Sequence, residues 1–553
     1  MYIRTLTNPS KTKWRVLICR SKRTGSKVSQ EVVKYLGVAH TQEQLKALQK
    51  LALVEMHAIS TGRQLSIPEK SLCEGASFDH MVELQRISEG FHDVFGVMFE
   101  ILNLSPLLEK RSYELLKDIV IGRIATPASK RRTAEILSRD FSRPVSEDSI
   151  YRLMDKLFPL EMDLQAKVFN VSKRLCEESK IDLLFFDVTT LYFESQKADQ
   201  LRDFGYSKDH KINEVQVVLA LATTSEGLPL GYGLFPGKTA EVKTLLECLQ
   251  TWRKSFSIEN TAVVADRAMM SEDNLQAMEK ASLKYVVAAK LRSFPKKIKD
   301  ALLSRQNENE LLFDEESVRV QEHLVNGRRL IVSFSANRAH KDREDRRRLL
   351  DRLAQKVSSS GDSSPKKLIT NRGFLKYFEE KAQGKLTFNE QRVEEEAQWD
   401  GLHGVITNDL ASSSEEILSR YRRLWVIEES FRINKSSLEM RPVYHFKPHR
   451  IRAHILICYL AFAISRYTQK QIEKYVGFIS IEKIRDALGG VESSLLEDQL
   501  TGERYILPSS MSQEARNIYR AMGLQRQRYP SKAPRKRTKC SEQEKTQVIE
   551  YQG

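Results

Sequence analysis

The chain has 553 residues, of which 41% are hydrophobic, so it can bury a large core and whole-chain disorder is excluded. At roughly 100–200 residues per domain, this length predicts three or more lobes. Lys and Arg number 89 against 73 Asp and Glu, which gives a net charge of +16 and a pI near 9.3. This balance favours a polyanionic partner, although a solvated Lys-rich surface produces it too.

The cysteine pattern and the hydropathy exclude further classes of protein. The six cysteines form no CxxC pair and no zinc-spaced cluster, which fits a reducing cytosol. The first 20 residues contain no apolar segment of the kind found in secretory signals. The most apolar stretch, residues 455–464, is about half the ~20 residues of a membrane helix. We therefore expect a buried core helix there and no membrane association.

Residues 1–45 are predicted to form a basic β-hairpin region. Apolar alternation over 14–18 and 32–36 flanks a turn at 22–26. Seven basic residues fall in this region: Lys11, Lys13, Arg15, Arg20, Lys22, Arg23 and Lys27. The hairpin either contacts DNA or caps a neighbouring domain with a solvated basic face.

Residues 46–175 are predicted to form a helical DNA-binding region. Apolar residues recur at helical spacing over 78–104, and Ser146 is a candidate N-cap for a later helix. A basic run, Lys130, Arg131 and Arg132, lies at the start of a short helix. Short helices with a basic connection suggest a helix-turn-helix that contacts DNA, while an ordinary α-hairpin is the alternative.

The pattern changes to strands from residue 181 onward. Short apolar runs alternate with helical segments: 183–189, 215–222, 231–235, helix 240–252, 261–265, helix 271–280 and 285–289. This order predicts a mixed sheet with helices on its faces, first over 176–290 and then over 403–475. Residues 291–402 are charged and interrupt the order, so we interpret them as an insertion into one fold, with a separate domain as the alternative. Residues 476–553 are predicted to form a C-terminal helical region and a basic tail.

Three carboxylates stand at positions suited to metal-dependent chemistry. Asp187 lies at the end of one apolar strand, Asp266 directly follows another, and Glu428 lies in the helix after the insertion. Ligands of open α/β sheets gather at the carboxyl ends of strands. Two aspartates there would repel each other unless a hard cation such as Mg²⁺ or Mn²⁺ lay between them. The glutamate could complete a two-metal site for phosphodiester chemistry.

The stretch 413–438 is predicted to be one helical run, opened by a capping box of Ser413 and Glu416. Tyr421 and Lys435 each lie seven positions from Glu428, so a continuous helix would place all three on one face. The simpler alternative is an amphipathic helix whose apolar residues pack on the sheet.

Five segments in order resemble bacterial insertion-sequence transposases of the DDE class, in the subgroup with a YREK signature. They are FFDVTTLYFE, GYSKDHKINEVQVVLAL, GLPLGYGLFPGKTAEVKTL, VVADRAMMS and LWVIEESFRINKSSLEMRPVYH, and the resemblance spans roughly residues 80–470. It implies an α/β, ribonuclease H-like core with flanking helices, and a β-rich insertion before the helix of the catalytic glutamate.

The resemblance also implies a function and a set of residues. Asp187, Asp266 and Glu428 would be catalytic and would hold two Mg²⁺ or Mn²⁺ ions. The expected DNA-binding residues are Tyr421, Arg423, Lys435, Arg267, Lys130, Arg131 and Arg132. The signature Arg is replaced by Leu424, which puts one DNA-end contact in doubt.

The implied partners are double-stranded DNA, as inverted-repeat ends and target, and a second copy of the chain when DNA is bound. No organic cofactor is expected, and the expected location is the nucleoid in a prokaryotic cytoplasm. The alternatives are a transposase-derived DNA-binding protein without catalysis and a ribonuclease H-like nuclease without end specificity. Trp399 would stack on a flipped base or be a core residue.

Overall fold

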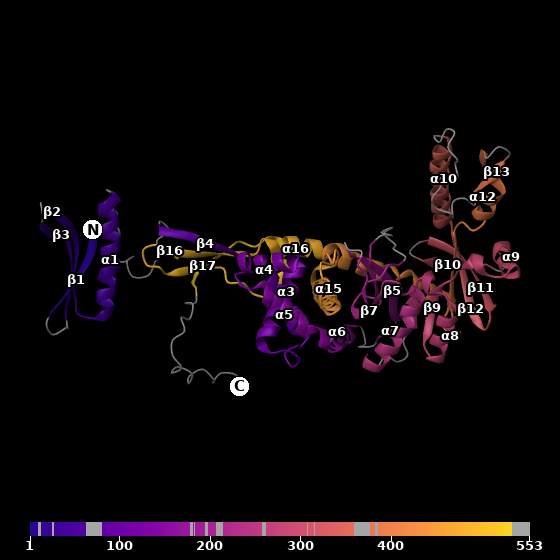
Figure 1. Cartoon of the computed structure of the whole chain (residues 1–553), viewed down its shortest axis with the longest axis horizontal. Coiled ribbons are helices and arrows are strands. Elements are labelled where there is room, and N and C mark those ends of the chain that lie inside the picture. The colour runs from indigo at the N-terminus through magenta and orange to yellow at the C-terminus, as the bar shows by residue number, and fades with distance from the viewer. Residues whose placement is uncertain are drawn as a thin grey trace.

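The computed structural model describes most of the chain, and Figure 1 shows its elements distributed along one long axis. The described residues are 1–8, 13–24, 27–61, 80–176, 181, 183–193, 197–205, 214–256, 262–306, 308–313, 316–358, 377–381 and 385–533. The Ser/Gly/Pro-rich stretch 358–365, for which the sequence predicts a loop, lies outside these ranges beyond its first residue, and so does the basic tail from 534 onward.

The N-terminal unit is a three-stranded antiparallel sheet covered by one helix. Its elements are β1 (Tyr2–Thr7), β2 (Trp14–Thr24), β3 (Lys27–Ala39) and α1 (Gln42–Thr61). Val16 and Ile18 of β2 are fully buried in a small core to which α1 contributes Leu45 and Ala52. The basic side chains of β2 are exposed at Arg15, Arg20, Lys22 and Arg23, as is that of Lys13 just before the strand. The predicted hairpin is confirmed, with longer strands than the sequence indicates.

A helical layer follows, and the helix predicted within 78–104 is only half right. Its first part is strand β4 (Met81–Ser88), and helix α2 (Gly90–Glu100) begins only afterwards. The strand pairs antiparallel with β16 (Glu492–Asp498), about 400 residues later in the chain. The remaining helices of this layer are α3 (Lys110–Ala125), α4 (Lys130–Arg139), α5 (Glu147–Leu157), the 3₁₀ turn Phe158–Leu160 and α6 (Glu161–Leu175).

The layer closes around α15 (Pro448–Val476), which packs against α2, α3, α5 and α6. Residues 453–465 of α15 are buried throughout, so the predicted core helix is confirmed. Among the described helices, α15 included, none combines the length and apolar character that a membrane span requires. The remaining C-terminal elements are α16 (Ile481–Gly489), β17 (Arg504–Pro508), α17 (Gln513–Ala521) and β18 (Ser531–Lys532). Of these, α17 packs on α15, whereas β17 and β18 continue the sheet of β16 and β4.

A nine-stranded mixed sheet forms the other half of the molecule. Its strand order is β10-β11-β12-β15-β9-β8-β5-β6-β7. Pairing is parallel for β5–β8 and β8–β9 and antiparallel elsewhere. The first group of strands and helices is β5 (Leu183–Tyr192), β6 (Gln216–Thr223), β7 (Pro229–Pro236), α7 (Glu241–Phe256), β8 (Ala262–Ala265), α8 (Glu272–Lys280) and β9 (Lys284–Ala288). The predicted mixed sheet with flanking helices is confirmed.

Three of the inserted strands extend this same sheet, and two others pair only with each other in a separate two-stranded sheet. Strand β12 pairs with β15 (Leu402–Thr407), and β15 pairs with β9 of the first part. The other inserted elements are α9 (Lys296–Ser304), β10 (Asn309–Phe313), β11 (Glu316–Val325), β12 (Arg328–Ser335), α10 (Ala336–Ser358), β13 (Phe378–Lys381), β14 (Lys385–Phe388) and α12 (Glu390–Ala397). In Figure 1, α10, α12 and β13 project from the edge of the sheet.

Candidate active site

Asp187 and Asp266 are brought together by two parallel neighbouring strands. Strands β5 and β8 pair in register, and the last pair of residues is Phe186 with Ala265. One residue further on each strand are Asp187, which is half-buried, and Asp266, which is exposed. Neighbouring strands lie about 4.8 Å apart, so these carboxylates stand side by side.

Both aspartates face the same side of the sheet. Phe185 and Val264 pair with each other and belong to the core cluster that also holds Ile417 and Ile427. Because side chains alternate along a strand, residues two positions further on project to the same side. Asp187 and Asp266 therefore face the helices that follow the insertion.

Those helices are α13 (Ser414–Arg422) and α14 (Trp425–Arg432). Helix α13 packs on β8 and β9, whereas α14 packs on β5 and β6. The predicted capping box is present. The Ser413 hydroxyl accepts a hydrogen bond from the Glu416 backbone N–H, and the Glu416 carboxylate accepts one from the Ser413 backbone N–H. Glu428 lies on α14, and its side chain is exposed.

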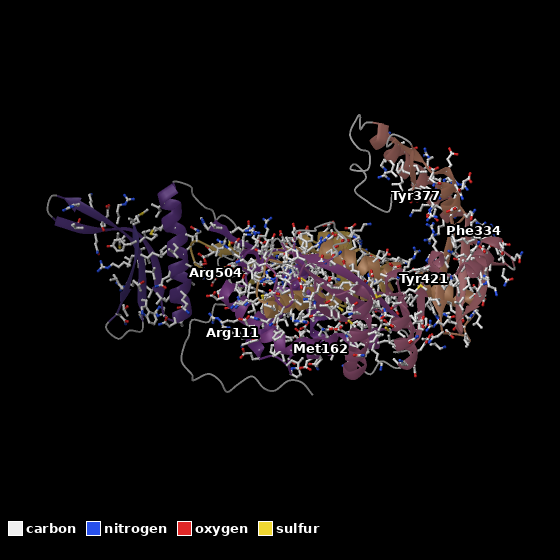
Figure 2. All side chains as sticks on the ribbon, turned by 45° about the vertical axis from the view of Figure 1, so that its right-hand side comes forward. Arg111, Met162, Phe334, Tyr377, Tyr421 and Arg504 are labelled. Atoms are coloured by element: carbon white, nitrogen blue, oxygen red, sulfur yellow. The ribbon has the colours of Figure 1, made fainter. Side chains whose placement is uncertain are left out.

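The Tyr421 hydroxyl interacts electrostatically with both Asp266 and Glu428. Burial raises the pKa of the Tyr421 hydroxyl, and the negative charges of Asp266 and Glu428 raise it further, while Arg267 and Arg338 oppose this shift. A phenol that responds to both carboxylates lies near both. Figure 2 labels Tyr421 beside the sheet, toward the end that carries the inserted strands. The structure therefore brings Asp187, Asp266, Glu428 and Tyr421 into one region.

The sequence interpretation missed two residues of this region, His403 and Arg338. The His403 ring lies against Tyr421, with centroids 4.9 Å apart. Burial lowers the pKa of His403 to about 3, and the charges of Arg338 and Arg267 contribute. His403 lies on β15, and Arg338 lies at the exposed start of α10. The only sequence signal for either was its place in or just after the insertion.

The predicted single helix over 413–438 is wrong. Helix α13 ends at Arg422, Arg423 and Leu424 form a turn, and α14 begins at Trp425. A π-helical segment, Ile433–Ser437, then follows α14. Tyr421, Glu428 and Lys435 therefore do not share the face of one ideal helix, although Tyr421 and Glu428 still lie close.

The break has a packing cause. Leu424 is 8% exposed and belongs to the main core, whereas Arg423 is exposed. The buried Leu424 side chain fixes the turn between α13, which packs on β8 and β9, and α14, which packs on β5 and β6. Lys435 lies in the π-helical segment and is half-buried.

Lys130 does not lie on the open surface, and its expected DNA contact stays a prediction. Lys130 is 3% exposed, and its Nζ lies 3.1 Å from Nδ1 of His454. Its neighbours Arg131 and Arg132 are exposed and pair with Glu135. Trp399 is half-buried and packs against a small core of the insertion, with the Arg292 guanidinium 6.0 Å from its ring.

Comparison with known proteins identifies the class. The family described as "Transposase DDE domain" matches residues 178–464, more than half of the chain. The chain therefore belongs to this family and is a DDE-type DNA-cleaving enzyme. A search of curated proteins gave no match.

Solved structures with some similarity include a piggyBac transposase synaptic complex with hairpin DNA. It has a TM-score of 0.36 and 10% identity, over 72% of this chain and 78% of that one. Another is a Mos1 transposase paired-end complex with the left transposon end, with a TM-score of 0.15 and 10% identity, over 29% of this chain and 53% of that one.

DDE transposases use divalent metal ions, and the donor chemistry here suits them. Two carboxylates side by side, with a third on the facing helix, offer hard oxygen ligands. In the described part of the chain, however, no group of three or more His, Cys, Asp or Glu side chains is close enough to hold a metal ion. Asp187, Asp266 and Glu428 would therefore have to approach one another more closely to hold an ion together.

Proposed function

We propose that this protein is the transposase of an insertion sequence, with a ribonuclease H-like core and a catalytic triad of Asp187, Asp266 and Glu428. It would bind the inverted-repeat ends of its element, cleave them and join the 3′-hydroxyls to target DNA. The observation that supports this most directly is the pairing of Asp187 and Asp266 beyond β5 and β8, on the face that α14 covers.

In this proposal the two aspartates bind the metal from the sheet and Glu428 binds it from the helix. Divalent ions, two of them Mg²⁺ or Mn²⁺, would supply an activated nucleophile and charge stabilisation for the leaving oxygen. Asp266 and Glu428 are already exposed, so scissile DNA can reach them. Burial, together with the negative charge of Asp266 and Glu428, raises the pKa of Tyr421, so the hydroxyl keeps its proton and can donate a hydrogen bond to a phosphate oxygen.

Basic groups around the carboxylates suit a polyanionic substrate. Arg267 directly follows Asp266, and Arg338 reaches the same region from α10. Arg423 and Lys435 flank Glu428 along the chain and would contact the DNA end. The N-terminal unit and the helical region up to residue 175 would recognise the ends, and a dimer would pair them.

The test compares cleavage of a duplex that carries the element's ends with cleavage of a random duplex. The ends are taken from the DNA that flanks the reading frame. End-specific nicking by the wild type, and its loss in Asp187→Asn, supports the proposal. Equal cleavage of both duplexes would indicate a general nuclease, and end binding without any cleavage would indicate a non-catalytic DNA-binding protein.

A further inference from the structure

A basic pocket lies outside the carboxylate site, between α3, α4 and the segment that leads into α15. Its volume is about 550 Å³. Five basic side chains line it: Arg123, Lys130, Arg131, Arg132 and Arg441. Two imidazoles, His445 and His454, line it as well, and the two carboxylates among its lining residues are Glu147 and Glu439.

The deepest cations of this pocket are buried. Arg123 is 5% exposed and Lys130 is 3% exposed. Arg123 donates to the Ala128 carbonyl at 2.6 Å, and Lys130 contacts Nδ1 of His454. Across the described part of the chain, no carboxylate lies within ion-pair distance of either side chain. A guanidinium stays charged at all ordinary pH values, so burying it without a counter-charge is costly.

The imidazoles do not supply the missing negative charge. Nε2 of His454 lies 3.0 Å from the Met440 carbonyl, so this nitrogen donates and Nδ1 accepts from Lys130. His454 is therefore neutral. The His445 ring lies 5.3 Å from the His454 ring, centroid to centroid, and burial together with Lys130 and Arg123 lowers its pKa to about 3.

The position of the basic run adds to the positive potential. Lys130, Arg131 and Arg132 occupy the first turn of α4, and that turn holds no acidic residue. The N-terminal end of a helix already carries partial positive charge and favours anions. Burial and the charge of Arg123 lower the pKa of Lys130 to about 7, which shows how strongly cations are disfavoured there.

We propose that this pocket binds a phosphate group, held at its base by Lys130 and Arg123 and at its mouth by Arg131. A phosphate offers the several acceptor oxygens that these donors need, and its charge balances the buried guanidinium. The source is either a backbone phosphate of bound DNA or a free phosphate. The first source rests on the proposed function; the second does not.

The experiment uses the full chain and two readouts. The first is the melting temperature in inorganic phosphate and in chloride at equal ionic strength. Phosphate should raise it by about 2 °C or more in the wild type, and Lys130→Met should abolish this rise. The control is Lys110→Met, an exposed lysine that starts α3 about 20 Å from Arg123, and it should keep the full rise.

The second readout is duplex affinity at several salt concentrations. If the pocket takes a DNA phosphate, Lys130→Met should reduce the slope of log affinity against log salt by about one. If Lys130→Met loses the rise of the melting temperature in phosphate but keeps the salt slope of duplex affinity, the pocket binds free phosphate and not a DNA phosphate. If the wild type binds no DNA, the proposed function is refuted. The melting temperature in phosphate still tests whether the pocket binds phosphate.

Two results would overturn the pocket proposal, both with a salt slope that Lys130→Met leaves unchanged. In the first, Lys130→Met keeps the rise of the melting temperature in phosphate. In the second, the wild type shows no such rise. Should Lys130→Met fail to fold, Arg131→Gln replaces it. The Arg131 side chain is 81% exposed, and its distance to Glu135 is a long 3.9 Å, so this change leaves the fold intact. It should reduce the phosphate rise, and an undiminished rise counts against the proposal.

Discussion

Asp187 and Asp266 stand side by side because each is the next residue after an in-register pair of parallel strands, Phe186 and Ala265. Their shared face is fixed by alternation from Phe185 and Val264, which are buried under the same helices. The juxtaposition thus depends on backbone pairing and not on any flexible loop. Two carboxylates held so close need a counter-charge to act together.

Neutralising either aspartate should stop the chemistry without unfolding the protein. Asp187→Asn or Asp266→Asn removes a charge that holds Mg²⁺, so strand cleavage should fall roughly a thousandfold. Binding to element ends should stay near normal in a gel-shift assay, because the amide keeps the side-chain shape. Normal cleavage in Mg²⁺ by either variant would show that the pair is not the metal site.

Neighbouring glutamates on α14 provide a matched comparison. Glu428 is exposed and influences Tyr421, whereas Glu429 is half-buried and lies 3.7 Å from Arg432. They point about 100° apart on the helix. Glu428→Gln should lose nearly all cleavage, and Glu429→Gln should keep most of it in the same nicking assay. The reverse ranking would move the catalytic glutamate by one residue.

The sequence predicted correctly that Asp187 and Asp266 follow paired residues of two strands, because these strands are short and strongly apolar. It did not predict the break at Arg423 and Leu424, since both residues are good helix formers and only the burial of Leu424 against the sheet reveals the turn. Strand β4 was taken for a helix because the partner that decides its state lies about 400 residues away, in β16. Lys130 was taken for a surface residue because lysine is rarely fully buried.

The N-terminal unit should contribute to DNA affinity independently of the rest. Its core is self-contained, and four basic side chains of β2 are exposed. Deleting residues 1–79 leaves the β4–β16 pairing intact, whereas a cut at 175 would remove a strand and five helices that pack on the rest. The shorter deletion should weaken duplex binding and flatten its salt dependence, measured by fluorescence anisotropy. If the salt dependence of duplex affinity is unchanged by the deletion, the N-terminal unit does not contact DNA and only covers a neighbouring part of the protein.

Acid should destabilise the site region through His403. Its pKa is about 3 in the folded chain against 6.5 for an ordinary histidine. The unfolded chain therefore binds the proton first, and stability falls as the pH drops from 6.5 toward 3. For this one group the loss is at most about 1.4 kcal/mol per pH unit. His403→Phe keeps a ring against Tyr421 and should show a shallower fall in denaturant midpoint between pH 6.5 and 4.5; an equal fall would contradict the assignment.

Restoring the signature arginine at position 424 should damage the protein, not improve it. Leu424 is 8% exposed within the main core and anchors the turn between α13 and α14. Leu424→Arg removes that apolar packing and forces a guanidinium to the core's edge, which should cost about 2–4 kcal/mol of stability. Leu424→Met, which conserves volume, should cost less than about 1.5 kcal/mol and keep cleavage. Denaturant unfolding with a parallel nicking assay separates the outcomes: a stable Leu424→Arg protein with faster end cleavage would mean that the turn can open to present position 424 to DNA.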